Sequence, residues 1–306
     1  MRDDHIFIMA PPRSGTEMLS RALGRCPGTY LITEHKRKAE IPEEQNPTPD
    51  REFWEQAFGL PRRAQETPEE VEFDPQAFEH LNRLWTAHSG GQRLIIKNPN
   101  NVVRAREIRR AFPNAQFVWL LRNPWAVIQS MLGGKDAGRK ATMFVGATEV
   151  LRHADPLLRA AASWAYAVQV MKQLQSSADI TTRYEDLVKN PQQELKRLVD
   201  HLKLTFSVHS AEVLHLRKED FRVVRYLLRR SPTREATIEM LAPVASDLGY
   251  PTRPPRGAPG DDWIFGVRYL LTILRRPHKN RLYGFPRLEK MSAAVMKARA
   301  RMLRRV

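Results

Sequence analysis

Short apolar runs alternate with helix-like stretches in the first half of the chain. Predicted strands span residues 5–10, 29–33, 93–97 and 116–121, and predicted helices span residues 16–24, 102–112 and 124–132. Strands that alternate with helices are typical of a doubly wound parallel sheet flanked by helices. The sequence therefore predicts an α/β fold.

The rest of the chain is predicted to be mainly helical. Further helices are expected over residues 156–175, 191–201 and 231–248, with a short strand over 179–182. A polar, Pro-rich segment, residues 37–91, interrupts the alternation, and we interpret it as a helical insertion. Insertions that follow strand ends lie near the ligand crevice of an open α/β sheet, so this segment is our candidate for selecting an acceptor.

Two helices are expected inside the insertion, near residues 50–58 and 74–88, because large apolar side chains recur there at helical spacing. These side chains are Trp54, Phe58, Phe78, Leu81 and Trp85. We expect them to pack onto the sheet rather than to contact a substrate.

A strand that runs into a Gly-containing loop marks the first candidate site. Residues 8–16 read Ile-Met-Ala-Pro-Pro-Arg-Ser-Gly-Thr, and a helix is predicted from Thr16 onward. The first N–H groups of a helix have no intrahelical acceptor, and the helix dipole adds positive charge there, so this turn predicts an anion-binding site. It is not a Walker A loop, because only Gly15 is present and no Lys follows it.

Two later blocks add groups of the same kind. Arg122 follows the predicted strand over 116–121, and Ser130 lies eight residues further, about two helical turns along the next helix. A guanidinium and a hydroxyl in this relation can hold one phosphate. The third block is Tyr184-Glu-Asp-Leu187, which follows the short strand over 179–182.

Together, and in this order, the three blocks resemble the sulfotransferases that use 3′-phosphoadenosine 5′-phosphosulfate (PAPS) as donor. The motif pattern is most similar to the tyrosylprotein and bacterial members, and the resemblance extends from residue 5 to about residue 250, where the chain reads Asp-Leu-Gly-Tyr. It implies a P-loop-like sheet, a sulfotransferase domain over residues 1–250, and transfer of a sulfuryl group to a hydroxyl acceptor with no metal expected.

The resemblance also implies which residues bind the donor. They are Arg13, Ser14, Gly15, Thr16 and Glu17 for the 5′-phosphosulfate, Arg122 with Ser130 for the 3′-phosphate, and Tyr184 for the side of the adenine. Glu17 departs from the family, which commonly has a hydroxyl residue there. Its carboxylate either faces inward and repels the 5′-phosphate, or faces outward on the first helical turn, where the dipole favours it.

Three catalytic residues are implied as well. In the tyrosylprotein subfamily an Arg in the loop and a Lys at the next strand end flank the transferring group, and Arg13 and Lys97 occupy these positions. The catalytic Glu of that subfamily corresponds in spacing to Glu34, 21 residues after Arg13. The His that cytosolic small-molecule members place after the Lys is absent, because Asn98 follows Lys97. We therefore expect Glu34 to be the general base. His35 is the alternative, although strand alternation would turn it to the other face.

Composition bounds the class and the compartment. The chain of 306 residues is 42% hydrophobic and 27% charged, as expected of a soluble globular protein. Its one cysteine, Cys26, excludes an internal disulfide and a multi-cysteine zinc site, and we expect a reducing, cytoplasmic location. A strand is predicted directly after the first four residues, so no signal or transit peptide is expected.

Most of the net charge of +16 lies in a basic C-terminal extension, residues 251–306, with fourteen Lys/Arg against three Asp/Glu. No nucleic-acid motif accompanies this charge, so we expect no nucleic-acid partner. The extension is predicted to be helical, with an apolar run over 263–274 too short to span a bilayer and an amphipathic stripe over 291–306. It would either contact an anionic membrane surface peripherally or pack on the core or a sister subunit, and we favour the second.

The sequence leaves the acceptor open among carbohydrate, lipid, phenol and protein tyrosine. Two other functions remain as alternatives. One is a P-loop-type kinase that uses ATP and Mg²⁺, which the missing Walker Lys disfavours. The other is a non-catalytic nucleotide-binding scaffold.

Overall fold

The strands that the sequence predicts all belong to one parallel sheet. The computed structural model describes residues 3–33, 75–133, 155–207, 210 and 221–255, and within these ranges the sheet has five strands in the order β2-β3-β1-β4-β5. They are β1 (Ile6–Met9), β2 (Thr29–Thr33), β3 (Arg93–Lys97), β4 (Gln116–Leu121) and β5 (Ile180–Arg183). Every neighbouring pair is parallel, which confirms the predicted α/β class.

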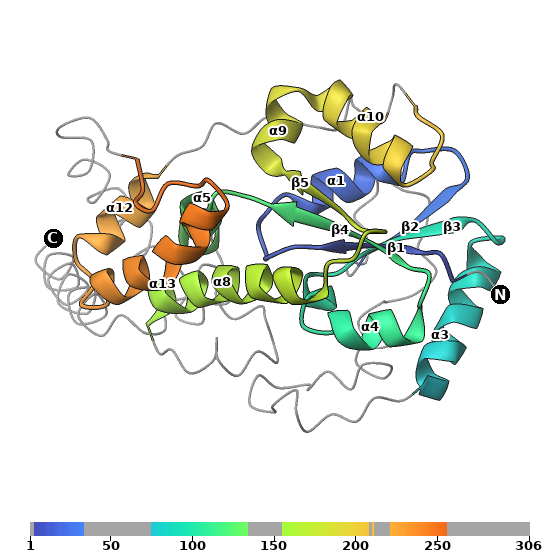
Figure 1. Ribbon diagram of the computed structural model, residues 1–306, viewed down its shortest axis with the longest axis horizontal. Helices are drawn as coiled ribbons and strands as arrows, with labels where there is room; N and C mark the ends of the chain where they lie inside the picture. The colour runs from blue at the N-terminus through green and yellow to red at the C-terminus, as the bar shows by residue number, and fades with distance from the viewer. Residues whose placement is uncertain (1–2, 34–74, 134–154, 208–209, 211–220, 256–306) are drawn as a thin grey trace, which may run out of the picture. The chain divides into compact units, whose positions relative to one another are not determined.

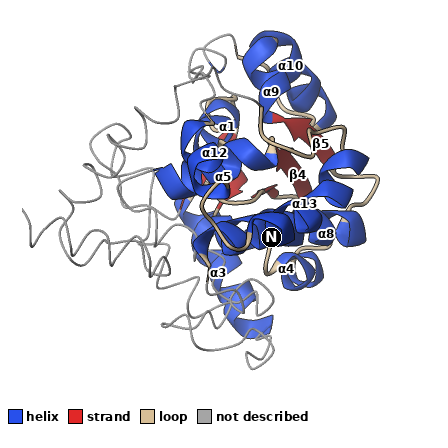
Figure 2. Cartoon of the chain, turned by 90° about the vertical axis from the view of Figure 1, so that its left-hand side faces the viewer, coloured by secondary structure: helices blue, strands red, loops and turns tan. Residues whose placement is uncertain are grey.

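Helices cover both faces of this sheet (Figures 1 and 2). On one face lie α1 (Thr16–Leu23), α9 (Tyr184–Lys189) and α10 (Pro191–His201), which share a core with Ile6 and Ile8 of β1. On the other face lie α3 (Pro75–His88) and α4 (Ala105–Ala111). Because both faces are covered, the central strands are apolar on both sides, as parallel strands require.

The second face is built from aromatic rings. The Phe112 ring packs against Phe7 of β1, with 5.5 Å between the ring centroids. It also packs against two rings of α3, Phe78 at 6.1 Å and Trp85 at 6.4 Å between centroids. Phe78 and Trp85 are buried. The expectation that these insertion aromatics pack onto the sheet is confirmed for both, whereas Trp54 and Phe58 lie outside the described residues.

The order of the strands places a topological switch at the carboxyl end of β1. From β1 the chain crosses over β3 to reach β2, and from β3 it crosses back over β1 to reach β4. Ligands bind at such a switch in open α/β sheets, because the connections leave in opposite directions and open a crevice. The Gly-containing loop that the sequence singles out directly follows β1.

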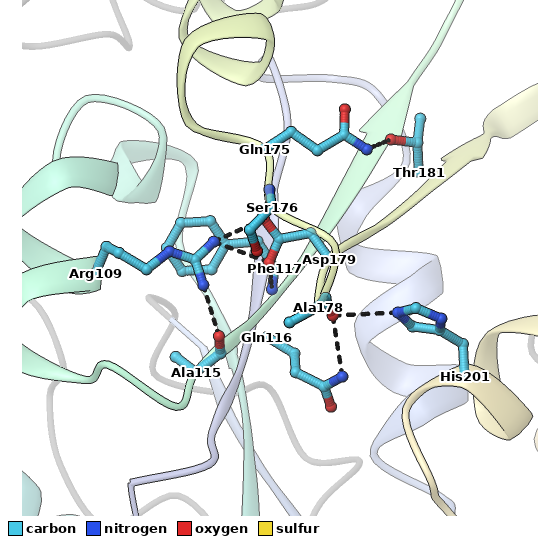
Figure 3. A network of polar contacts seen from close by, with 10 residues as sticks. All are labelled: Arg109, Ala115, Gln116, Phe117, Gln175, Ser176, Ala178, Asp179, Thr181 and His201. Carbon is cyan, nitrogen blue, oxygen red and sulfur yellow. Dashed lines mark hydrogen bonds and ion pairs between the residues drawn. The ribbon is translucent and has the colours of Figure 1, made fainter.

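A buried carboxylate fixes the start of β5 against β4 (Figure 3). Asp179, whose side chain is fully buried, accepts two hydrogen bonds from Arg109 of α4, at 2.8 and 2.7 Å, and one each from the backbone N–H groups of Phe117 and Ser176, both at 2.9 Å. The Arg109 guanidinium also lies 3.7 Å from the centroid of the Phe117 ring. These contacts join α4, β4 and the turn before β5.

The described residues divide into two compact units. The first carries the sheet, α1, α3, α4, α9, α10 and the second half of α8 (Pro156–Leu174). The second carries the first half of α8 together with α5 (Pro124–Gly133), α12 (Arg222–Leu228) and α13 (Arg234–Asp247).

In the second unit the Gln129 side chain accepts a hydrogen bond from the Val224 N–H at 2.9 Å. The indole N–H of Trp125 donates to the Pro251 carbonyl at 3.0 Å. These bonds tie α5 to α12 and to the segment after α13. Across the described ranges, no helix combines the length and the hydrophobicity that crossing a bilayer demands.

Two details differ from the sequence-based expectation. The predicted helix over 102–112 begins at Ala105, and the 3₁₀ turn η3 (Pro99–Asn101) precedes it, because Pro99 and the asparagines around it favour a tight turn after the strand. Helix α12 was not predicted. The expected helix over 231–248 is present as α13, with Pro243 inside it.

Candidate functional site

The loop after β1 has the backbone of an anion-binding turn. Arg13 has a φ of 72° and Gly15 a φ of 99°, so left-handed residues flank Ser14. The Ser14 N–H donates to the Pro11 carbonyl at 3.3 Å, and helix α1 then starts at Thr16 with Gly15 as its N-terminal cap. Successive N–H groups in such a turn form a concave anion site, and the first turn of the helix adds its own.

The side chain of Ser14 also indicates an anion-binding site. Its hydroxyl is fully buried and has no hydrogen-bond partner among the described residues. A buried hydroxyl without a partner is costly, and an anionic oxygen in the loop would accept its hydrogen bond. The loop therefore fits a phosphosulfate or phosphate group through both its backbone and a side chain.

Three sequence blocks that lie far apart in the chain converge at this loop. Arg122, after β4, donates from Nη1 to the Arg13 carbonyl at 3.0 Å. The same guanidinium lies 4.1 Å from the centroid of the Tyr184 ring, at the start of α9. A Cβ on Gly15 would stand only 2.6 Å from that ring, so Gly15 and Tyr184 are in direct contact. The first motif, the second and the third thus form one cluster.

Lys97 reaches the cluster from the neighbouring strand. It is the last residue of β3, opposite Ile8 of β1 in the sheet register, and it is buried. Its Nζ lies 3.6 Å from the Glu17 Oε2 on the first turn of α1. The sequence predicts that this lysine lies near the loop. In the structure the ion pair with Glu17, which follows the loop, places it there.

Glu17 has a second cationic neighbour. Its Oε1 accepts from Arg21 Nε at 2.9 Å, one helical turn further along α1. The sequence leaves the orientation of this carboxylate open. In the structure the carboxylate pairs with the side chains of Lys97 and Arg21.

Two predicted residues are not among the contacts described so far. Glu34, with its alternative His35, lies outside the described residues, but Thr33, which directly precedes it, is opposite Lys97 in the register of β2 and β3. Ser130 is half-buried on α5, in the second unit. The roles of Glu34 and Ser130 stay predictions from the sequence.

Sequence reasoning missed Asn101, which is fully buried at the end of η3. Its Nδ2 donates to the Ile8 carbonyl at 3.3 Å and to the Ile96 carbonyl at 3.2 Å, and so ties the ends of β1 and β3 together. This holds the loop and Lys97 in a fixed relation. The run Asn-Pro-Asn-Asn after a strand end was the available signal, because asparagine amides commonly satisfy backbone groups at turns.

No three His, Cys, Asp or Glu side chains gather as metal ligands would in the ranges that the structure describes. What the cluster offers instead is cationic side chains, backbone N–H groups and a hydroxyl. Such a set can bind an anion and stabilise negative charge that develops on it.

A family profile and a curated relative each match part of the chain. A profile of the sulfotransferase family matches residues 5–208. A Caenorhabditis elegans protein, described as a candidate protein-tyrosine sulfotransferase, is 27% identical over 144 residues, which cover 44% of this chain and 49% of that protein. The chain thus spans about half the length of this curated relative.

Solved structures with a similar fold include the sulfotransferase domain from the curacin biosynthetic pathway. It is 21% identical, with a TM-score of 0.49, and the match covers 82% of this chain and 99% of that domain. A mouse sulfotransferase complexed with PAP is 15% identical, with a TM-score of 0.47, and the match covers 81% and 88% of the two chains.

Proposed function

The chain belongs to the sulfotransferase family, and on this premise we propose that it transfers a sulfuryl group from PAPS to a hydroxyl group of an acceptor. The observation that carries the proposal is the convergence of Arg13, Arg122, Tyr184 and Gly15 at the carboxyl end of β1. In the reaction an acceptor oxygen forms a bond to sulfur as the bond from sulfur to the 5′-phosphate oxygen breaks. The acceptor hydroxyl loses its proton, and adenosine 3′,5′-bisphosphate (PAP) leaves.

The residues would act mainly by position and charge. The loop N–H groups, with the Ser14 hydroxyl, would hold the 5′-phosphosulfate. Arg13 and Lys97 would stabilise the negative charge that grows on the sulfuryl and leaving oxygens, as cationic clamps do in phosphoryl transfer. Arg122, together with Ser130, would bind the 3′-phosphate.

Glu34 is the proposed general base. It directly follows Thr33, the residue opposite Lys97 in the sheet register, which supports a place near the transferring group. The acceptor classes that we propose are protein tyrosine, another phenol, carbohydrate and lipid. The partial match to a protein described as acting on tyrosine supports a phenolic hydroxyl among them.

Nucleotide binding tests this proposal without knowledge of the acceptor. In a thermal-shift assay PAP should stabilise the protein, whereas Mg·ATP should not, because a kinase site would need the Walker lysine that this loop lacks. The variant R13A should lose most of the PAP effect, and R25A, which removes an exposed arginine beyond the end of α1, should retain it. Stabilisation by Mg·ATP alone would favour the kinase alternative. PAP binding without transfer in a broad acceptor screen would favour a non-catalytic scaffold.

We further propose that residues 1–250 form the sulfotransferase domain and that the basic extension, residues 251–306, serves a separate role. Packing on the core or on a sister subunit is the favoured role, and the net charge supports the alternative, peripheral contact with an anionic membrane. The free thiol of Cys26 is compatible with the reducing cytoplasm. Flotation of the full chain with anionic and with neutral vesicles tests the contact. Equal recovery with both vesicle types would reject an electrostatic membrane role.

A further inference from the structure

Glu17 connects the loop to Lys97 through charge. The Lys97 side chain is only 6% exposed, and its Nζ lies 3.6 Å from a carboxylate that is itself 45% exposed. An anionic neighbour stabilises an ammonium group removed from water, because their attraction offsets part of the desolvation cost. Glu17 supplies such an anion at the side of the loop where the proposed donor would place its negatively charged phosphosulfate.

The position of Glu17 sets it in competition with that donor. It stands in the first turn of α1, whose N–H groups are proposed to hold the 5′-phosphosulfate. Two anions that share one ammonium weaken each other's contact with it, and they also repel each other. Arg21, at 2.9 Å, is a partner that Glu17 can keep when Lys97 turns toward another anion.

On the basis of the proposed function, we propose that Glu17 is a positioning residue, which holds Lys97 beside the loop before the donor binds and yields it to the phosphosulfate afterwards. Glu17 then lowers donor affinity relative to a neutral residue at the same place. It acts through Lys97, and it is not itself a ligand of the donor. A role as donor ligand or as a purely structural residue predicts the opposite sign, since its removal would then weaken binding.

Calorimetry with PAPS and with PAP separates these possibilities without an acceptor. The variant E17Q keeps the shape of the side chain and removes its charge, and we expect it to bind PAPS about fivefold more tightly, the scale of one charge pair near a solvent-exposed site. The gain should be smaller for PAP, which lacks the sulfuryl group that Lys97 is proposed to contact. The matched control is E79Q, which removes a carboxylate from another i,i+4 Glu–Arg pair, on α3, and should leave both affinities unchanged.

A double-mutant cycle tests whether the effect runs through Lys97. In a K97M background, E17Q should change PAPS affinity by less than about twofold. K97M has no ammonium for Glu17 and the donor to share, and Arg21 still neutralises the Glu17 carboxylate in that variant. An undiminished gain in that background would show direct repulsion and overturn the inference. If E17Q proves too unstable to titrate, E17T, which installs the hydroxyl residue common in the family, replaces it with the same expected sign.

The wild-type titration keeps the two proposals apart. If the wild-type chain binds neither PAP nor PAPS, the proposed function fails, and this inference fails with it. If the wild type binds both while E17Q and E17T bind PAPS equally well or more weakly, only the role of Glu17 is overturned.

Discussion

Gly15 is constrained both by its backbone conformation and by a close neighbour. Its φ of 99° disfavours any side chain, and an added Cβ would stand 2.6 and 2.9 Å from two atoms of the Tyr184 ring. Gly28 has a φ of 76° but nothing within 4 Å of the same added atom. Comparing substitutions at Gly15 and at Gly28 therefore separates the cost of backbone strain from the cost of steric overlap.

We expect G15A to lower the free energy of unfolding by about 2–4 kcal/mol, since left-handed strain and overpacking add, whereas G28A should lose only about 1 kcal/mol from strain. Urea unfolding of both variants measures the difference. Because the Tyr184 ring would have to move, G15A should also bind PAP more weakly, and G28A should not. Equal losses of stability would mean that the overlap between the added Cβ and the Tyr184 ring costs no free energy of unfolding.

Tyr184 supports Arg122 through the face of its ring. The guanidinium lies 4.1 Å from the ring centroid and also donates to the Arg13 carbonyl, so the ring determines where this cation is held. We expect Y184F to keep PAP affinity within about twofold and Y184L to lose about fivefold or more, because a cation–π contact needs the ring and not the hydroxyl. Calorimetry with PAP measures both. A loss in Y184F as large as that in Y184L would assign the effect to the hydroxyl group instead.

Asp179 organises several elements through one carboxylate. It accepts hydrogen bonds from α4, from β4 and from the turn before β5, and its side chain is fully buried (Figure 3). We expect D179A to cost about 3–5 kcal/mol, since it leaves Arg109 without its carboxylate and two buried N–H groups without an acceptor. D200A, which breaks the exposed pair of Asp200 and Lys196 on α10, should cost less than about 1 kcal/mol. Similar urea midpoints for the two variants would contradict this assignment.

Glu194 ties α10 to β5 and makes that contact sensitive to acid. The hydrogen bond from Arg197 lowers the pKa of the Glu194 carboxyl below its usual 4.5, with a further hydrogen bond from Thr182, although burial opposes the shift. A lowered folded-state pKa stabilises the fold above the usual pKa, and this stability is lost as the pH falls below about 4.5. We expect the stability advantage of the wild type over E194Q to be constant above about pH 5.5 and to shrink below pH 4.5. Chemical unfolding of both proteins across this range measures it, and parallel curves would contradict the linkage.

For the molecule as a whole, local patterns predicted the elements well and their partners poorly. Strands β2, β3 and β4 have the predicted bounds, because short apolar runs between turn residues depend only on nearby sequence. The strand order depends on residues far apart in the sequence, and the contact of Arg122 with Arg13 joins residues 109 positions apart, which no local pattern contains. The pairing of Glu17 with Lys97 is of the same kind. The family resemblance brought the three site blocks together, but it did not predict that Tyr184 would support Arg122.

The single thiol offers a test of how the first unit responds to the donor as a whole. Cys26 lies between α1 and β2, is 3% exposed, and burial raises its pKa, although a hydrogen bond with Ser210 opposes the shift. It should therefore react with a thiol reagent such as Ellman's reagent only when this part of the chain opens. Opening that separates α1 from the sheet would also dismantle the loop, so PAP at a hundred times its Kd should slow labelling about 100-fold. Adenosine 5′-monophosphate, which lacks the 3′-phosphate proposed to contact Arg122, should protect far less at the same concentration. Labelling that stays equally fast with saturating PAP would show that Cys26 becomes accessible without loss of the loop, and the donor site and the α1–β2 connection would then open independently.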